Sequence, residues 1–170
     1  MKNRRVNKFF ACMLLLAILS VCFVGCQAER EKKTADAAIN YLTYRGQAIT
    51  VGGCDLEQLL KSLGEDYTVK EGESCAGGRE YIYQYPSLRL YTTRFPSGST
   101  VVTTVRYTDD GVDHYGVRIG SPEADVSATF GEPDVLEPDR LMYFSDGAVL
   151  TFLLRDGVVT LISLTQSFPV

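Results

Sequence analysis

The sequence predicts an α+β fold of two similar units, each a helix followed by a three-stranded antiparallel meander. We expect the units to form one sheet with the helices on one face. Three observations lead to this prediction: an internal repeat, a short glycine-bounded helical segment in each copy, and strand-like runs separated by hairpin turns. Helices segregated to one face of an antiparallel sheet are a stable layer arrangement.

The internal repeat is visible when residues 53–65 are aligned with residues 120–132. Each of these segments begins with a glycine and has a second glycine at its penultimate position, so the glycine spacing is the same in both. Similar short extended pieces, 44–49 and 114–119, precede them. Self-similarity of this kind is typical of repeated structural units. We therefore expect a tandem-repeat domain over residues 39–170, with repeats at about 44–108 and 114–165.

Each repeat contains one predicted helix between its glycines. Ser121 is a suitable N-cap, Pro122 suits the first helical position, and Gly131 can adopt the left-handed C-cap conformation. Asp55 followed by Gln58 resembles a capping box. Apolar side chains at helical spacing predict a face packed on the sheet in preference to a groove for a partner; they are Leu56, Leu59, Leu60, Leu63, Val126 and Phe130.

The predicted strands alternate apolar and polar side chains, which is typical of a sheet with one buried face. Asp146-Gly147 and Asp156-Gly157 are strong signals for two-residue hairpin turns, and Pro96-Ser97-Gly98 supplies a further turn. The strands are expected at 81–85, 88–94, 100–108, 141–144, 148–154 and 158–164.

Residues 1–25 are expected to be a lipoprotein signal peptide. A basic segment precedes an uncharged apolar run from Phe9 to Val24, which is too short for an ordinary spanning helix. The run ends in Phe23-Val24-Gly25-Cys26, which resembles a lipobox with Phe23 where leucine is usual. We expect palmitate-type acylation of Cys26, and two or three chains give a stable anchor in the bilayer. A plain secretory signal and an uncleaved anchor are the alternatives.

This signal predicts a protein at the cell membrane, lipid-anchored on the extracytoplasmic side. Residues 26–38 are polar and charged and are expected to form a tether. Four of the 17 basic residues lie in the first 25, so the remainder carries 13 basic and 21 acidic residues and a formal charge of -8. An acidic domain is a poor match for nucleic acid or an anionic membrane surface.

Cys54 and Cys75 remain once the signal peptide is removed and Cys26 is acylated. Disulfides persist in exported proteins, so we expect these two cysteines to pair. The closed loop would contribute on the order of 3 kcal/mol. The alternative is a reactive thiol at Cys54, near a helix start that would lower its pKa.

A search for catalytic and metal-binding sets leads to no assignment. The sequence has one histidine, His114, and contains no Gly-x-Ser-x-Gly, Cys-x-x-Cys or His-x-x-x-His motif. Asp109, Asp110 and Asp113 lack the spacing of a calcium loop and are expected to form a solvated turn. We therefore expect no enzyme activity, no cofactor and no metal.

The most suggestive candidate for a binding surface is aromatic. Tyr81, Tyr83 and Tyr85 share one face of a strand because side chains alternate with a period of two. Tyr91 lies on the next predicted strand. Tyrosine suits binding surfaces, but it is also a good strand former. The four tyrosines are thus either a contact surface or part of a half-buried sheet.

The sequence also resembles known families. Residues 116–133 and the following meander are similar to the beta-lactamase inhibitor protein, built of two helix-plus-sheet repeats, and to the small lipoproteins of outer-membrane assembly, with one. Residues 55–67, with Ser74-Cys75-Ala76 after them, are similar to uncharacterised cell-surface lipoproteins of Gram-positive bacteria. The resemblance covers about residues 48–165 and implies fold and location, with no catalytic residue.

Together these observations predict a membrane-anchored, non-catalytic module that binds or assembles with a protein partner. The resemblance suggests an alternative, an inhibitor of a secreted enzyme. A hydrolase with an unrecognised site ranks below both.

Overall fold

The structure is a computed structural model that describes residues 39–73 and 77–167. The predicted signal peptide, the predicted acylation site Cys26, the predicted tether and Cys75 lie outside the described residues. Among the described residues, no helix has the length and apolar character needed to cross a membrane.

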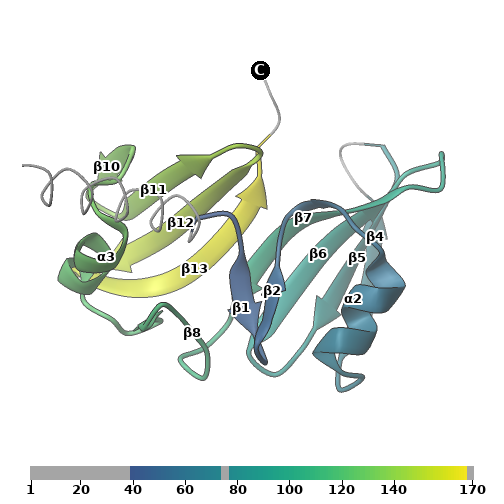
Figure 1. Ribbon diagram of the computed structural model, residues 1–170, viewed down its shortest axis with the longest axis horizontal. Coiled ribbons are helices and arrows are strands. Elements are labelled where there is room, and N and C mark those ends of the chain that lie inside the picture. The colour runs from purple at the N-terminus through teal and green to yellow at the C-terminus, as the bar shows by residue number, and fades with distance from the viewer. Residues whose placement is uncertain (1–38, 74–76, 168–170) are drawn as a thin grey trace, which may run out of the picture. The chain divides into compact units, whose positions relative to one another are not determined.

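The predicted architecture of two helix-plus-three-stranded-meander repeats is wrong. The described chain is mostly β, and its main element is a nine-stranded antiparallel sheet (Figure 1). Eight strands are hydrogen-bonded in the order β10-β11-β12-β13-β7-β6-β5-β4. Among the described strands, the ninth, β3, pairs with β7 only. Their bounds are β3 (Gly52–Gly53), β4 (Thr68–Glu73), β5 (Arg79–Gln84), β6 (Leu88–Arg94), β7 (Thr100–Tyr107), β10 (Val135–Glu137), β11 (Arg140–Ser145), β12 (Ala148–Arg155) and β13 (Val158–Gln166).

The prediction failed for the strands at the two edges of the sheet and for the strand pairing in its middle. The edge strand β4 reads Thr-Val-Lys-Glu-Gly-Glu and is exposed throughout, so it shows no apolar alternation to identify it. The opposite edge strand, β10, has three residues. At the middle, β7 pairs with β13 through Thr104–Arg106 and with β3 through Val101 and Val102. No local sequence pattern specifies such long-range pairing.

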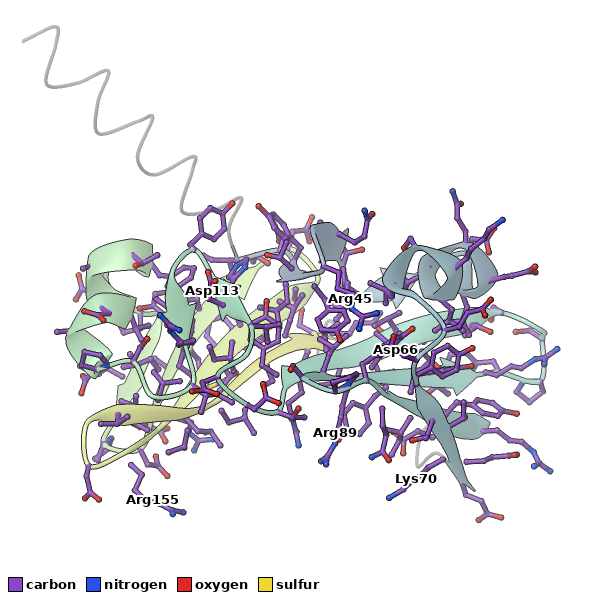
Figure 2. The ribbon with its side chains drawn as sticks, turned by 90° about the horizontal axis from the view of Figure 1, so that it is seen from below. Arg45, Asp66, Lys70, Arg89, Asp113 and Arg155 are labelled. Carbon is purple, nitrogen blue, oxygen red and sulfur yellow. The ribbon has the colours of Figure 1, made fainter. Side chains whose placement is uncertain are left out.

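Two helices and two small hairpins complete the described chain. The helices are α2 (Leu56–Leu63) and α3 (Glu123–Phe130), with eight residues each. One hairpin pairs β1 (Leu42–Tyr44) with β2 (Gln47–Ile49), and the other pairs β8 (Asp113–His114) with β9 (Val117–Arg118). Figure 2 shows both helices on the same side of the sheet.

The core lies between these helices and the sheet. A row of buried side chains crosses six neighbouring strands on this covered face: Tyr143, Leu150, Leu164, Val105, Leu90 and Tyr83. Leu63, Val126 and Phe130 are buried on the helices, while Leu56, Leu59 and Leu60 are partly buried against the core. The prediction that the helical apolar stripes pack on the sheet is therefore confirmed.

The two helices begin in different ways. Asp55 is the N-cap of α2 and accepts a hydrogen bond from the Gln58 N–H at 3.1 Å, as the capping pattern predicts. The prediction of Ser121 as the N-cap of α3 is wrong, because Pro122 occupies that position without a side-chain cap. Ser121 Oγ instead accepts from the Arg118 N–H.

The β12–β13 hairpin takes over the capping of α3. The Glu123 N–H donates to the Gly157 carbonyl at 2.9 Å. Helix N-termini leave free N–H groups that require acceptors. Here the acceptor comes from a turn distant in sequence, so a side-chain cap is not needed for that group.

The predicted hairpin turns are confirmed. Asp146-Gly147 joins β11 to β12, Asp156-Gly157 joins β12 to β13, and residues 95–99 join β6 to β7. Asp156 and Gly157 have φ values of 53° and 72°, which suit the primed turns of two-residue hairpins.

The two segments predicted as short extended pieces, 44–49 and 114–119, each turn back on themselves. Arg45-Gly46 turns the β1–β2 hairpin, and Tyr115-Gly116 turns the β8–β9 hairpin. Arg45 and Tyr115 have positive φ values of 52° and 53°. Asparagine or aspartate is usual there, so the turn signal is weak in the sequence.

Candidate functional site

The face of the sheet opposite the helices, which we call the open face, has no described helix over it. Figure 2 shows Lys70, Arg89 and Arg155 on this side, whereas Arg45, Asp66 and Asp113 lie on the side of the helices. The pairing register defines two neighbouring rows of side chains that cross the open face. These rows, which no described helix covers, are the candidate surface for a partner.

The first of these, the Arg89 row, crosses eight strands. Along the sheet it contains Val135, Met142, Thr151, Ser163, Arg106, Arg89, Gln84 and Thr68. The second, the Tyr91 row, contains Phe144, Val149, Thr165, Thr104, Tyr91, Ile82 and Lys70.

The two rows change character from one end of the sheet to the other. The end on β10, β11 and β12 is largely apolar, and Phe144 is 47% exposed there. Serine and threonine occupy the middle. The end on β7 to β4 carries the cations Arg106, Arg89 and Lys70 beside Tyr91. Neither row contains an aspartate or a glutamate.

Arg89 and Arg106 occupy directly opposed positions on β6 and β7. Arg89 is exposed and Arg106 is half-buried. The Arg106 guanidinium lies over the Tyr91 ring, 5.5 Å from its centroid, a cation–π contact. Arg106 Nε is buried and has no hydrogen-bond partner among the described residues.

The ion pairs of the described chain lie elsewhere. They join Arg45 to Asp66, Arg79 to Glu71 and Arg140 to Glu137. In the first, the Arg45 hydrogen bond lowers the pKa of the Asp66 carboxyl. Within residues 39–73 and 77–167, Arg89, Arg106 and Lys70 form no ion pair.

The predicted tyrosine surface is divided between the two faces. Tyr83 and Tyr85 are buried on the covered face, and Tyr81 is partly buried against the core. Tyr91 lies on the open face, opposite Thr104 and Ile82. The structure therefore does not bring the four tyrosines together in one surface, because Tyr91 has the opposite phase on its strand.

The covered tyrosines form a chain of rings with other elements. Tyr67 contacts Tyr83 and Tyr85 with centroid distances of 5.3 and 5.2 Å, and Tyr44 contacts Tyr85 at 5.5 Å. Burial raises the pKa of Tyr85, and its hydroxyl has no hydrogen-bond partner among the described residues. This cluster forms part of the core.

Cys54 is half-buried and carries a free thiol in the structure. Burial raises the pKa of this thiol, and the neighbouring Asp55 carboxylate raises it further. A raised pKa opposes the reactive-thiol alternative, since the thiolate is the nucleophile. The predicted partner, Cys75, lies outside the described residues, so the disulfide stays a prediction.

His114 is fully buried within an aromatic cluster. Its ring stacks on Phe130 at 5.7 Å and meets Tyr41 and Tyr115 edge-on at 5.4 and 4.7 Å. Its Nδ1 lies 3.3 Å from Thr43 Oγ1. These contacts give His114 a packing role between the hairpins and α3.

The carboxylates near His114 are engaged by backbone groups. Asp109 accepts from the Gly111 N–H and Asp113 accepts from the Gly116 N–H, at 2.9 and 2.8 Å. These bonds are typical of turns. Among the described residues, no group of three or more His, Cys, Asp or Glu side chains is arranged to hold a metal ion.

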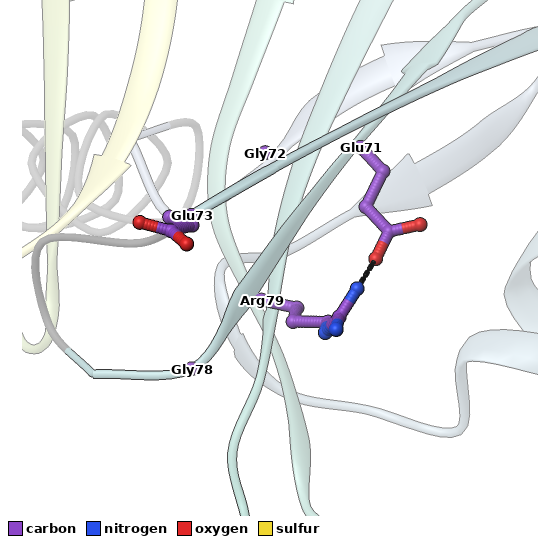
Figure 3. A pocket seen from close by; sticks show the side chains of 5 residues that line it. All are labelled: Glu71, Gly72, Glu73, Gly78 and Arg79. Carbon is purple, nitrogen blue, oxygen red and sulfur yellow. Dashed lines mark hydrogen bonds and ion pairs between the residues drawn. The ribbon is translucent and has the colours of Figure 1, made fainter.

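A shallow hollow of about 690 Å³ lies at the end of the β4–β5 hairpin (Figure 3). Arg79 forms an ion pair with Glu71 there, and Glu73 points away from that pair. Gly72 and Gly78 complete the lining. No site is assigned here, since residues 74–76, which join the two strands, lie outside the described part.

Comparisons with family models, curated proteins and solved structures find no match for this chain. The assignment of the candidate surface therefore depends on the geometry of the sheet alone. Sequence reasoning missed Arg89, Arg106 and Lys70. A signal for two of the open-face residues was present in the sequence. Leu88, Leu90 and Thr92 alternate toward the core, so Arg89 and Tyr91 between them point to the other face.

Proposed function

We propose that this chain is a lipoprotein, anchored on the extracytoplasmic side of the membrane through acylated Cys26, that acts as a non-catalytic protein-binding or assembly module. The observation that carries the proposal is the open face of the sheet. It combines the exposed Phe144 and its half-buried apolar neighbours Met142 and Val149 with cations that have no ion-pair partner among the described residues. Exposed patches of this kind mark interaction sites.

Binding is favoured over catalysis by what the polar side chains do. His114 is buried among aromatic rings, and Asp109 and Asp113 accept backbone hydrogen bonds in turns. Catalysis needs a nucleophile or base positioned beside a pocket. The contacts of these groups instead support a structural role.

A photo-crosslinking residue on the open face tests the binding function in intact cells. Replacing Thr151 of the Arg89 row should give a discrete crosslinked adduct with one protein. Replacing Gln58, exposed on α2, provides the matched control on the covered side and should give none. Equal adducts at both positions, or none at either, would remove the open face as the binding surface.

The anchor is tested separately by mass spectrometry of the protein from membranes. The expected amino terminus is an acylated Cys26, and Cys26→Ser should release the protein from the membrane or block its maturation. An unmodified amino terminus at another residue would contradict the lipoprotein proposal. The crosslinking result would remain valid in that case, since it concerns a different part of the chain.

A further inference from the structure

The cationic end of the open face places two like charges directly opposite each other. Arg89 and Arg106 occupy opposed positions on β6 and β7, where the Cβ atoms of opposed residues lie about 5 Å apart. Like charges in this position destabilise a sheet. An oppositely charged neighbour would compensate, and the two open rows contain none.

The nearest open-face carboxylate on β5 is too far away to compensate. Glu80 lies four residues from Gln84, the residue opposite Arg89, which corresponds to about 13 Å along the strand. The Tyr91 ring makes a cation–π contact with the Arg106 guanidinium, but Arg106 Nε has no hydrogen-bond acceptor among the described residues. The charge arrangement is therefore incomplete within the described chain.

We infer that Arg89 and Arg106 bind carboxylates of an acidic segment in the protein partner. This inference rests on the proposed function and names the chemistry of the partner. The guanidinium group is a planar fork that matches a carboxylate with two parallel hydrogen bonds. Lys70 extends the cationic area along the Tyr91 row.

The apolar end of the same face indicates the composition of the rest of the partner's segment. Phe144 on β11 lies four strands from Arg89 on β6, a span of about 19 Å at the usual strand spacing. An extended chain covers this span with about six residues. The partner segment therefore has apolar side chains at one end and carboxylates about six residues away.

Charge favours a protein segment over an anionic membrane or a nucleic acid. The chain from residue 26 onward has a formal charge of -8, which repels extended polyanions. A short acidic segment contacts only the cations of the two rows. Its apolar end also has a site on this face, at Phe144.

The test uses the full-length lipoprotein in nanodiscs of uncharged lipid and two labelled peptides. One peptide carries leucines at one end and glutamates at the other, and its copy carries lysines in place of the glutamates. Fluorescence anisotropy should show binding of the glutamate peptide alone. Arg89→Gln and Arg106→Gln should each weaken it by roughly tenfold or more, because each removes a charge-assisted contact of two hydrogen bonds with a carboxylate.

Arg118→Gln is the matched control, since it removes the same charge from an exposed position on the β8–β9 hairpin. It should leave the affinity unchanged. An equal loss in all three variants would show nonspecific charge attraction and overturn the inference. Arginine-dependent binding to phosphatidylserine vesicles without binding to the peptide would also overturn it, in favour of a membrane surface.

The crosslinked partner provides the second measurement. The peptide crosslinked at Thr151 should come from an acidic segment, and Arg89→Gln should reduce the adduct while the unfolding midpoint does not fall. An adduct that persists in Arg89→Gln and Arg106→Gln would refute the acidic segment and leave the binding function standing. Absence of any adduct at the open face would instead refute the binding function itself.

Discussion

Tyr107 connects three segments through one hydroxyl group. Its Oη accepts from the Thr43 N–H at 3.0 Å and donates to the Thr43 carbonyl at 2.6 Å, and the Asp113 carbonyl lies 3.3 Å away. The side chain is 1% exposed. The end of β7 is thereby attached to both small hairpins. Sequence alternation places Tyr107 in the core, but its partners on the two hairpins become evident only in the fold.

Tyr107 also predicts how stability depends on alkaline pH. Burial raises its pKa to about 12 from 10, and Tyr143 is raised to about 12 for the same reason. The folded state thus favours the protonated phenol. The stability from each phenol is complete below pH 10 and is lost as the pH rises from 10 toward 12, by up to about 3 kcal/mol.

Tyr107→Phe should lower the free energy of unfolding by about 1–3 kcal/mol near neutral pH, because both backbone groups of Thr43 lose their partner. It should also reduce the further loss between pH 10 and 12. Urea unfolding followed by circular dichroism at several pH values measures both effects. Tyr81→Phe, at a partly buried position on β5, is the control. An unchanged alkaline profile in Tyr107→Phe would contradict the assignment.

At the scale of elements, the Asp156-Gly157 turn serves both a hairpin and a helix. It joins β12 to β13, and the Gly157 carbonyl accepts the Glu123 N–H of α3. Hairpins of this type were predictable because their signal is local, with Asp-Gly between two alternating runs. The helix start was not, because its acceptor lies beyond three intervening strands of the chain. The polar edge strand β4 was missed for a different reason, the lack of a buried face.

Gly157→Ala should destabilise the protein by about 1 kcal/mol, since φ is 72° and no neighbouring atom obstructs a methyl group. It should also increase hydrogen exchange of the Glu123 amide. Gly147→Ala is a close control, because its turn has φ of 80° and is equally open, while its carbonyl accepts from the Ser167 N–H and not from α3. Similar exchange at Glu123 in both variants would argue against coupling between the turn and the helix.

At the scale of the whole described chain, the register of the sheet determines the candidate surface. Residues from seven or eight strands meet in each open row, and neighbouring members such as Arg106 and Ser163 are far apart in sequence. Strand positions and their inward residues follow from the sequence, because alternation is a local property. The opposition of Arg89 and Arg106 does not, since it depends on pairing and on the register shift at Tyr91 and Thr92.

The pairing of β13 with β7 has a kinetic consequence. β13 is the last strand of the sheet in chain order but occupies a place in its middle, with β12 on one side and β7 on the other. Until β13 has emerged, β7 and β12 present bare edges, which favour pairing with other chains. Contacts between residues so distant in sequence also form slowly. The newly made chain therefore passes through a period when it is vulnerable to aggregation, and this period ends when β13 inserts.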